Sequence, residues 1–230
     1  MNFELCTDSV EGARAAAKYG FKRIELCSAL SEGGLTPSYG LIKSCVEAGS
    51  AEVHVMIRSV GGSFICDNDE LDVMKLDIIE TARAGASGVV FGILDIDNQI
   101  SSYNLELLEL SASLGLEATF HRAFDQVANP MESLNRIIDM GFQRLLTSGL
   151  KPTAIEGIEL IRSLQMTYGD KIQIMAGSGV DENNAVELAS TGVNNLHFTA
   201  RYSVSDELVG MGSSMKTDER KMEAVCELFK

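Results

Sequence analysis

The stretch TFHRAFD, residues 119–125, carries three side chains that could do chemistry: His121, Arg122 and Asp125. They follow an apolar run that is typical of a buried strand. Imidazole and carboxylate groups transfer protons in enzymes, and a guanidinium binds carboxylate or phosphate. This position at a strand end makes His121 and Asp125 candidate catalytic residues. Two alternatives stay open: Asp125 could cap a turn, and Arg122, of opposite strand parity to His121, could face a helix.

Other predicted strands carry polar side chains at a spacing of two residues, which places them on one face of the strand. Glu4 and Glu25 lie on two such strands, and His54 and Arg58 share a third. If these faces point into a common interior, the side chains converge near His121. A buried charge needs a partner, so Arg58 could neutralise a glutamate. We therefore add Glu25 and Arg58 to the candidate catalytic residues and interpret His54 as structural.

The sequence has five cysteines, of which Cys6 and Cys27 end two neighbouring predicted strands. Two thiolates with Met56 nearby would be soft ligands suited to Cu(I). The alternative is that both are buried and inert, as free cysteines commonly are. An odd number of cysteines without a C-x-x-C pair does not fit a disulfide framework and predicts a reducing compartment.

A repeated unit positions these residues: a helical segment ends in glycine and a short apolar strand follows, as in KYGFKRIELC and RAGASGVVFG. Glycine is the usual residue at such a helix end. Eight strands are predicted, at about 3–6, 22–28, 52–58, 87–92, 116–121, 143–147, 171–176 and 194–198, with a last helix at about 217–229. Strict alternation predicts an α/β fold, a single-domain (β/α)8 TIM barrel over residues 1–230. A doubly wound open sheet is the alternative.

In such barrels the active site lies at the carboxyl ends of the strands, and phosphate often binds after the seventh and eighth strands. AGSGV, residues 176–180, lies at that place, and its glycines would let backbone N–H groups approach an anion. A plain tight turn would explain the glycines equally well. The residues predicted to bind a ligand or anion are Ser148, Gly177, Ser178, Gly179, His197 and Arg201.

The overall composition limits the partners. The chain has 230 residues, 45% of them hydrophobic, and a formal net charge of −14. Without a run of Lys and Arg, this charge disfavours nucleic acid and anionic membrane surfaces. No apolar run approaches the ~18 residues of a membrane span, and the N-terminus does not look like a signal peptide. The sequence predicts a cytoplasmic protein that would bind any anion at a local site.

Taken together, the motifs resemble the copper homeostasis protein family CutC over nearly the whole chain. The matching segments are ELCTDSVEGARAA, RIELCSALSEGGLTPS (23–38), VHVMIR, GVVFGIL (88–94), TFHRAFD (119–125), RLLTSG (144–149) and IMAGSGV (174–180). The resemblance implies a cytoplasmic TIM barrel that forms a homodimer or homotetramer. It also implies copper tolerance and trafficking, with Cu(I) bound by two cysteines that match Cys6 and Cys27.

The sequence departs from the family pattern in the loop after the third predicted strand. The family usually has Ile-Arg-Pro-Arg-Gly-Gly-Asp there, and this chain has IRSVGGS at 57–63. Ser59 and Val60 replace the proline and the second arginine, which removes one candidate anion contact. Ser101 replaces a usual Asp, and Thr199 replaces a usual Ser while keeping the hydroxyl.

Two functions follow as hypotheses. The first is a Cu(I)-binding protein that uses Cys6 and Cys27. The second is an enzyme acting on a small anionic metabolite, with Glu25 or His121 as general acid or base and Arg58 holding the negative charge of the substrate. No organic cofactor is evident from the motifs, and the sequence leaves open whether the protein is an enzyme.

Overall fold

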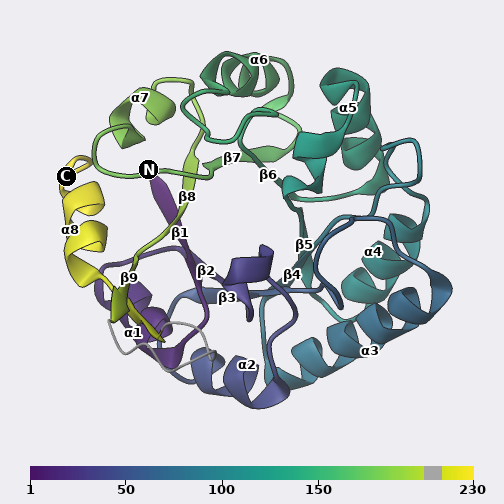
Figure 1. Ribbon diagram of the computed structural model, residues 1–230, viewed down its shortest axis with the longest axis horizontal. Coiled ribbons are helices and arrows are strands. Elements are labelled where there is room, and N and C mark those ends of the chain that lie inside the picture. Colours follow the sequence, from purple (N-terminus) through teal and green to yellow (C-terminus); the bar gives the residue numbers. More distant parts are fainter. Residues whose placement is uncertain (205–213) are drawn as a thin grey trace.

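The computed structural model describes residues 1–204 and 214–230. Eight parallel strands pair in chain order, and the last pairs with the first to close a barrel (Figure 1). The strands are β1 (Asn2–Thr7), β2 (Arg23–Leu26), β3 (Glu52–Met56), β4 (Gly88–Phe91), β5 (Glu117–Phe120), β6 (Arg144–Thr147), β7 (Gln173–Gly177) and β8 (Asn195–Thr199). The predicted (β/α)8 barrel is confirmed, and the open sheet is excluded.

Helices surround the barrel as an outer ring (Figure 1). They are α1 (Val10–Lys18), α2 (Tyr39–Val46), α3 (Asn68–Ala84), α4 (Tyr103–Ser113), α5 (Pro130–Met140), α6 (Ile158–Tyr168), α7 (Ala185–Ala189) and α8 (Glu219–Glu227). Short 3-10 turns follow β2 (η1, Leu30–Glu32) and β5 (η2, Arg122–Gln126), and an antiparallel ribbon of β9 (Arg201–Val204) and β10 (Ser214–Thr217) precedes α8. Within the described ranges, no helix is both long enough and apolar enough to cross a bilayer.

Local signals in the sequence set the helix ends. The side chain of Asp67 caps the first turn of α3, and Glu70 returns the bond to the backbone of Asp67, which completes a capping box. Asn129 caps α5, directly before its first residue, Pro130. Gly85 and Gly141 close these two helices in the left-handed conformation, with φ of 90° and 104°. An N-cap of this kind stabilises a helix by about 1 kcal/mol.

Alternate residues of the barrel strands face two different environments. Leu5, Ile24 and Phe120 belong to the large apolar core between the barrel and its helices. Residues of the opposite parity face the barrel interior. At its upper end Cys6, Cys27, Met56 and Val90 form a small separate cluster. The two-residue spacing in the sequence therefore correctly predicted which residues of these strands point into the barrel.

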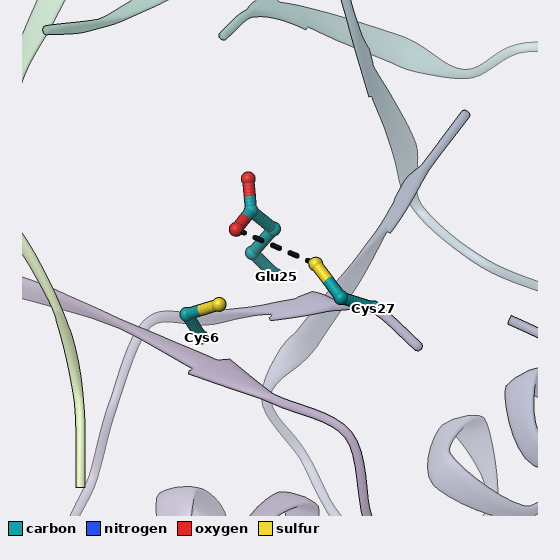
Figure 2. Close-up of side chains that lie close together, drawn as sticks. All are labelled: Cys6, Glu25 and Cys27. Carbon is teal, nitrogen blue, oxygen red and sulfur yellow. Dashed lines mark hydrogen bonds between the residues drawn. The ribbon is translucent and has the colours of Figure 1, made fainter. Parts of the chain in front are cut away.

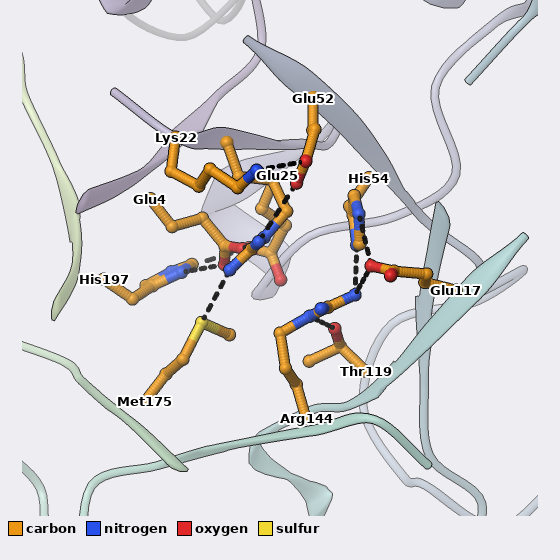
Figure 3. Close-up of polar contacts among 11 residues, drawn as sticks. Glu4, Lys22, Glu25, Glu52, His54, Glu117, Thr119, Arg144, Met175 and His197 are labelled. Atoms are coloured by element: carbon orange, nitrogen blue, oxygen red, sulfur yellow. Dashed lines mark hydrogen bonds and ion pairs between the residues drawn. The ribbon is translucent and has the colours of Figure 1, made fainter. Parts of the chain in front are cut away.

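Buried ionic groups occupy the lower part of the interior, where TIM barrels usually have bulky aliphatic residues. Arg23 donates to Glu4 across 2.5 Å and lies 3.3 Å from Glu52. The buried Arg144 donates across 2.6 Å to Glu117, whose own side chain is exposed at the end of the barrel, as Figure 3 shows. An unpaired buried charge costs several kcal/mol. Each buried arginine therefore needs its carboxylate partner to offset that cost.

Each of the three histidines lies beside a glycine of the neighbouring strand. A Cβ atom placed on Gly88 would lie 2.5 Å from Cε1 of His54, and one on Gly92 would lie 2.8 Å from Nδ1 of His121. These glycines thus provide the space in which an imidazole ring can lie across the barrel. The pairs are His54 with Gly88, His121 with Gly92, and His197 with Gly177.

Changing His54 to Gln should make the stability of the protein less sensitive to acid. Burial, followed by the charge of Arg144, lowers the pKa of His54 from 6.5 to about 3. Between these values the unfolded chain binds one more proton than the folded one, so the stability present above pH 6.5 is lost as the pH falls toward 3. From pH 7 to pH 5 the wild type should lose about 2 kcal/mol more than His54→Gln. Urea unfolding at both pH values measures this, and an equal loss in the two proteins would contradict it.

Candidate functional site

A cavity of about 360 Å³ opens at the carboxyl ends of the strands. This is where enzymes of this fold keep their active sites. Its lining includes Cys6, Glu25, Arg58, His121 and His197, all singled out from the sequence. The structure therefore brings these five residues, from five different strands or strand ends, to one place.

Glu4 and His197 form a buried pair that ties the floor of the barrel to this cavity (Figure 3). Nδ1 of His197 lies 2.8 Å from Glu4, whose other oxygen accepts the bond from Arg23. Burial would raise the pKa of Glu4, but the hydrogen bond and charge of His197, and then Arg23, lower it well below its ordinary value. Glu4 is therefore ionised.

The second ring nitrogen of His197 points toward Glu25, with Nε2 3.6 Å from Oε2. Burial alone would lower the pKa of His197. The neighbouring carboxylates and a hydrogen bond with Cys6 outweigh burial and raise that pKa well above its ordinary value. His197 is therefore an imidazolium at neutral pH, and both of its nitrogens carry protons.

Glu25 holds a proton more readily than an ordinary glutamate does. Its side chain is buried, and Oε1 has no hydrogen-bond partner among the described residues. Burial, followed by the charge of Cys6, raises the pKa of Glu25 well above its ordinary value. A protonated carboxyl at the edge of a cavity can donate a proton to a bound molecule.

Arg58 does not neutralise a glutamate, contrary to the sequence-based prediction. No ion pair joins it to Glu25 within residues 1–204 and 214–230. Its guanidinium stacks over the ring of Phe64 at 5.0 Å and donates to backbone oxygens. These are the carbonyls of Glu32, Gly34 and Gly62, at 2.9, 3.3 and 2.8 Å. The loops after β2 and β3 fold over the barrel and bring these carbonyls closer to Arg58 than the carboxylate is.

Cys6, Glu25 and Cys27 lie together, with both sulfurs and a carboxylate oxygen within 4.8 Å of one another (Figure 2). Cys27 is fully buried, whereas Cys6 is 5% exposed and lines the cavity. A hydrogen bond from Cys27, assisted by His197, lowers the pKa of Cys6 to about 5. The same contact raises the pKa of Cys27 well above its ordinary value. The pair therefore holds one thiolate and one thiol at neutral pH.

His121 lines the cavity as a neutral ring. Burial, followed by the charge of Arg58, lowers its pKa to about 3. Nδ1 accepts a bond from the backbone N–H of Ala123, so Nε2 carries the proton. The ring also packs against Phe64, with centroids 5.0 Å apart. At neutral pH His121 can donate a hydrogen bond to a ligand, while Glu25, with its raised pKa, is the candidate group for proton transfer.

Asp125 and Ser148 build the loop after β6 instead of lining the cavity. The Asp125 carboxylate is buried and accepts bonds from Thr147, Arg122 and the backbone of Leu150. Ser148 is fully buried, and its hydroxyl lies 2.8 Å from Asp125. Asp125 therefore stabilises a turn, which is the alternative that the sequence left open for it.

Two arginines lie where the sequence did not place them. Arg122 lines the cavity instead of facing a helix, because it belongs to η2 and strand parity does not apply there. Arg201 pairs with Asp8 at 2.8 Å and does not line the cavity beside the glycine loop, residues 176–180. Lys221 of α8 borders that loop where Arg201 was predicted to lie. Nothing in the sequence around Lys221 indicates this position.

Arg23 is the residue that sequence reasoning should have found. It precedes Glu25 and Cys27 at the same two-residue spacing, so the period that identified the others also points it inward. Its contact with Glu4 anchors the chain of charges that reaches the cavity.

A closed parallel barrel with buried charges and a cavity at the carboxyl ends of its strands defines a TIM-barrel protein. The chain belongs to the CutC family, whose family model matches residues 1–202.

Relatives and solved structures agree with this assignment. A family protein CutC of Bacteroides thetaiotaomicron is 41% identical over 225 residues, covering 94% of this chain and 90% of that protein. One of Vibrio cholerae is 42% identical over 215 residues, covering 93% and 85%. The crystal structure of a copper homeostasis protein CutC from Streptococcus agalactiae is 33% identical, covers 86% of this chain and 98% of that chain, and superposes with a TM-score of 0.80.

Glu4→Gln should destabilise the fold far more than Glu52→Gln, although both carboxylates contact Arg23. Glu4 is buried between two cations, so its loss leaves them uncompensated and should cost about 3 kcal/mol. The side chain of Glu52 is 33% exposed, and its loss should cost less than about 1 kcal/mol. Urea unfolding at pH 7 measures both values. Equal costs would show that the Glu4 contacts do not hold the barrel floor.

Proposed function

We propose that the protein binds Cu(I) through Cys6 and Cys27 as part of copper homeostasis. The observation that carries this proposal is the cluster of two sulfurs and a carboxylate oxygen within 4.8 Å at the cavity. Met56 packs in the same cluster and offers a third sulfur. Thiolates and thioethers are the ligands that Cu(I) prefers. Membership of the CutC family and the name of the Streptococcus agalactiae relative support the same assignment.

The two cysteines would take different parts in binding. Cys6 lines the cavity and is held as a thiolate, so it can meet an incoming ion first. Cys27 lies deeper and keeps its proton, which binding must displace. Copper is cargo in this proposal: the ion enters and leaves by the cavity and is not a fixed part of the fold.

Replacing either cysteine by serine should abolish tight Cu(I) binding. Anaerobic titration against a colorimetric Cu(I) chelator should find one ion per chain in the wild type. Cys6→Ser and Cys27→Ser should weaken binding by at least about 100-fold, since even the partners of metal ligands contribute roughly 10- to 100-fold.

Cys45→Ser is the matched control. Cys45 is also buried, but it lies on α2 in the core outside the barrel. Its replacement should leave the affinity unchanged. Equal binding by all three variants would overturn the copper proposal and turn attention to the second candidate.

The second candidate is an enzyme that acts on a small anionic metabolite. The observation that favours it is the size of the cavity, about 360 Å³, together with a buried carboxyl of raised pKa at its wall. Glu25 would exchange a proton with the substrate, and His121 would donate a hydrogen bond to it. Arg122 would hold the negative charge, because Arg58 already donates to loop carbonyls.

Glu25→Gln should slow proton exchange on any substrate by about 10²- to 10⁴-fold, the usual contribution of a positioned acid or base. Incubating the protein with small carboxylates and phosphomonoesters in D2O, followed by proton NMR, would detect exchange of substrate C–H groups. Glu52→Gln, which lies outside the cavity, is the control and should keep the wild-type rate. Exchange that persists in Glu25→Gln would overturn the role of this residue.

The cytoplasmic location and the homodimer or homotetramer implied by the family stay predictions. Light scattering from the purified protein measures the assembly. A mass of two or four chains is expected.

A further inference from the structure

A second cavity, of about 150 Å³, lies at the carboxyl ends of β7 and β8. Arg122 and His197 line both this cavity and the central one, so the two adjoin. The other contributors come from separate parts of the chain: the loop 178–180, Phe198, Thr199 and Lys221.

Three cationic side chains, Arg122, Lys221 and the His197 imidazolium, meet at this cavity in a chain whose net charge is −14. Lys221 makes no ion pair within the two described ranges. Arg122 uses Nε on Asp125 and Nη2 on Ser148, which leaves Nη1 for a further acceptor. The bonds to Asp125 and Ser148 also fix the guanidinium plane between the two cavities.

The loop 178–180 adds backbone donors. Ser178 and Gly179 have positive φ of 87° and 71°. The N–H groups of residues 178–180 donate no hydrogen bond to any part of the chain that the structure describes. The loop is held from its other side, where the Ser178 hydroxyl donates to the carbonyl of Pro152 and the Ser178 carbonyl accepts from Ala154. Successive unpaired N–H groups in a fixed turn form a concave anion site.

We propose that this second cavity binds the phosphate of a small phosphomonoester, whose remaining part extends past Arg122 and His197 into the central cavity. Cationic side chains, backbone N–H groups and the Thr199 hydroxyl suit an acceptor with several oxygens that point in different directions. The inference deepens the second candidate function. It rests on that function only for the part of the phosphomonoester that would lie in the central cavity and react. The phosphate site itself is tested by binding alone.

The first test measures the binding of inorganic phosphate by calorimetry. Lys221→Gln should weaken it by about tenfold or more, the usual contribution of a hydrogen bond to a charged group. Arg220→Gln is the matched control, because Arg220 is the preceding residue of α8 and its side chain is 88% exposed. Equal affinity in these two variants would overturn the phosphate site.

The second test uses glycerol 3-phosphate and separates the site from the proposed enzyme. If the molecule bridges the cavities, it should bind more tightly than phosphate, and Glu25→Gln should change its affinity while leaving that of phosphate unaltered. Phosphate binding that depends on Lys221, with no gain for glycerol 3-phosphate, would confirm the phosphate site and overturn the bridging part of the proposal.

Discussion

The buried carboxylate of Glu4 is the contact on which the interior of this barrel depends. Arg23 binds one of its oxygens and His197 the other, so a single anion joins β1 to both of its neighbours, β2 and β8. This is where the last strand of the barrel meets the first. Without Glu4, an arginine and an imidazolium would face each other in a low-dielectric interior. The pairing therefore fixes the closure of the barrel and the protonation of His197 at once.

The positive charge on His197 influences the protonation of the groups at the cavity wall, Cys6, Glu25 and Cys27. Its second nitrogen faces Glu25 and Cys6. The imidazolium stabilises a negative charge on one of these two groups. Cys6 carries that charge, and burial together with the Cys6 thiolate raises the pKa of both Glu25 and Cys27. The cavity wall thus contains a thiolate, a thiol and a carboxyl of raised pKa side by side. The same arrangement suits a soft metal ion and proton transfer to a small molecule, which is why both functions are proposed for one cavity.

Charges in the interior are expensive, and the outer layer offsets that cost. Apolar residues of alternate parity, such as Leu5, Ile24 and Phe120, pack against the ring of helices and are almost completely buried. Burial of such side chains contributes about 1.5–3 kcal/mol each. The barrel can therefore keep a polar interior, with glycines beside the histidines, because most of its stability comes from the layer outside the strands.

The sequence by itself determined the barrel, its eight strands and the inward face of each, because alternating β and α segments and a two-residue period are local properties of the chain. That period also pointed Glu25 into the interior and put Cys6 and Cys27 at equivalent ends of neighbouring strands. Only the tertiary structure decided where the cations lie. Arg58 turns to loop carbonyls, Arg201 to Asp8, and Lys221 arrives at the glycine loop from the last helix. Long, flexible cationic side chains bind whichever acceptor the fold brings within reach, and those acceptors lie on segments far apart in the sequence.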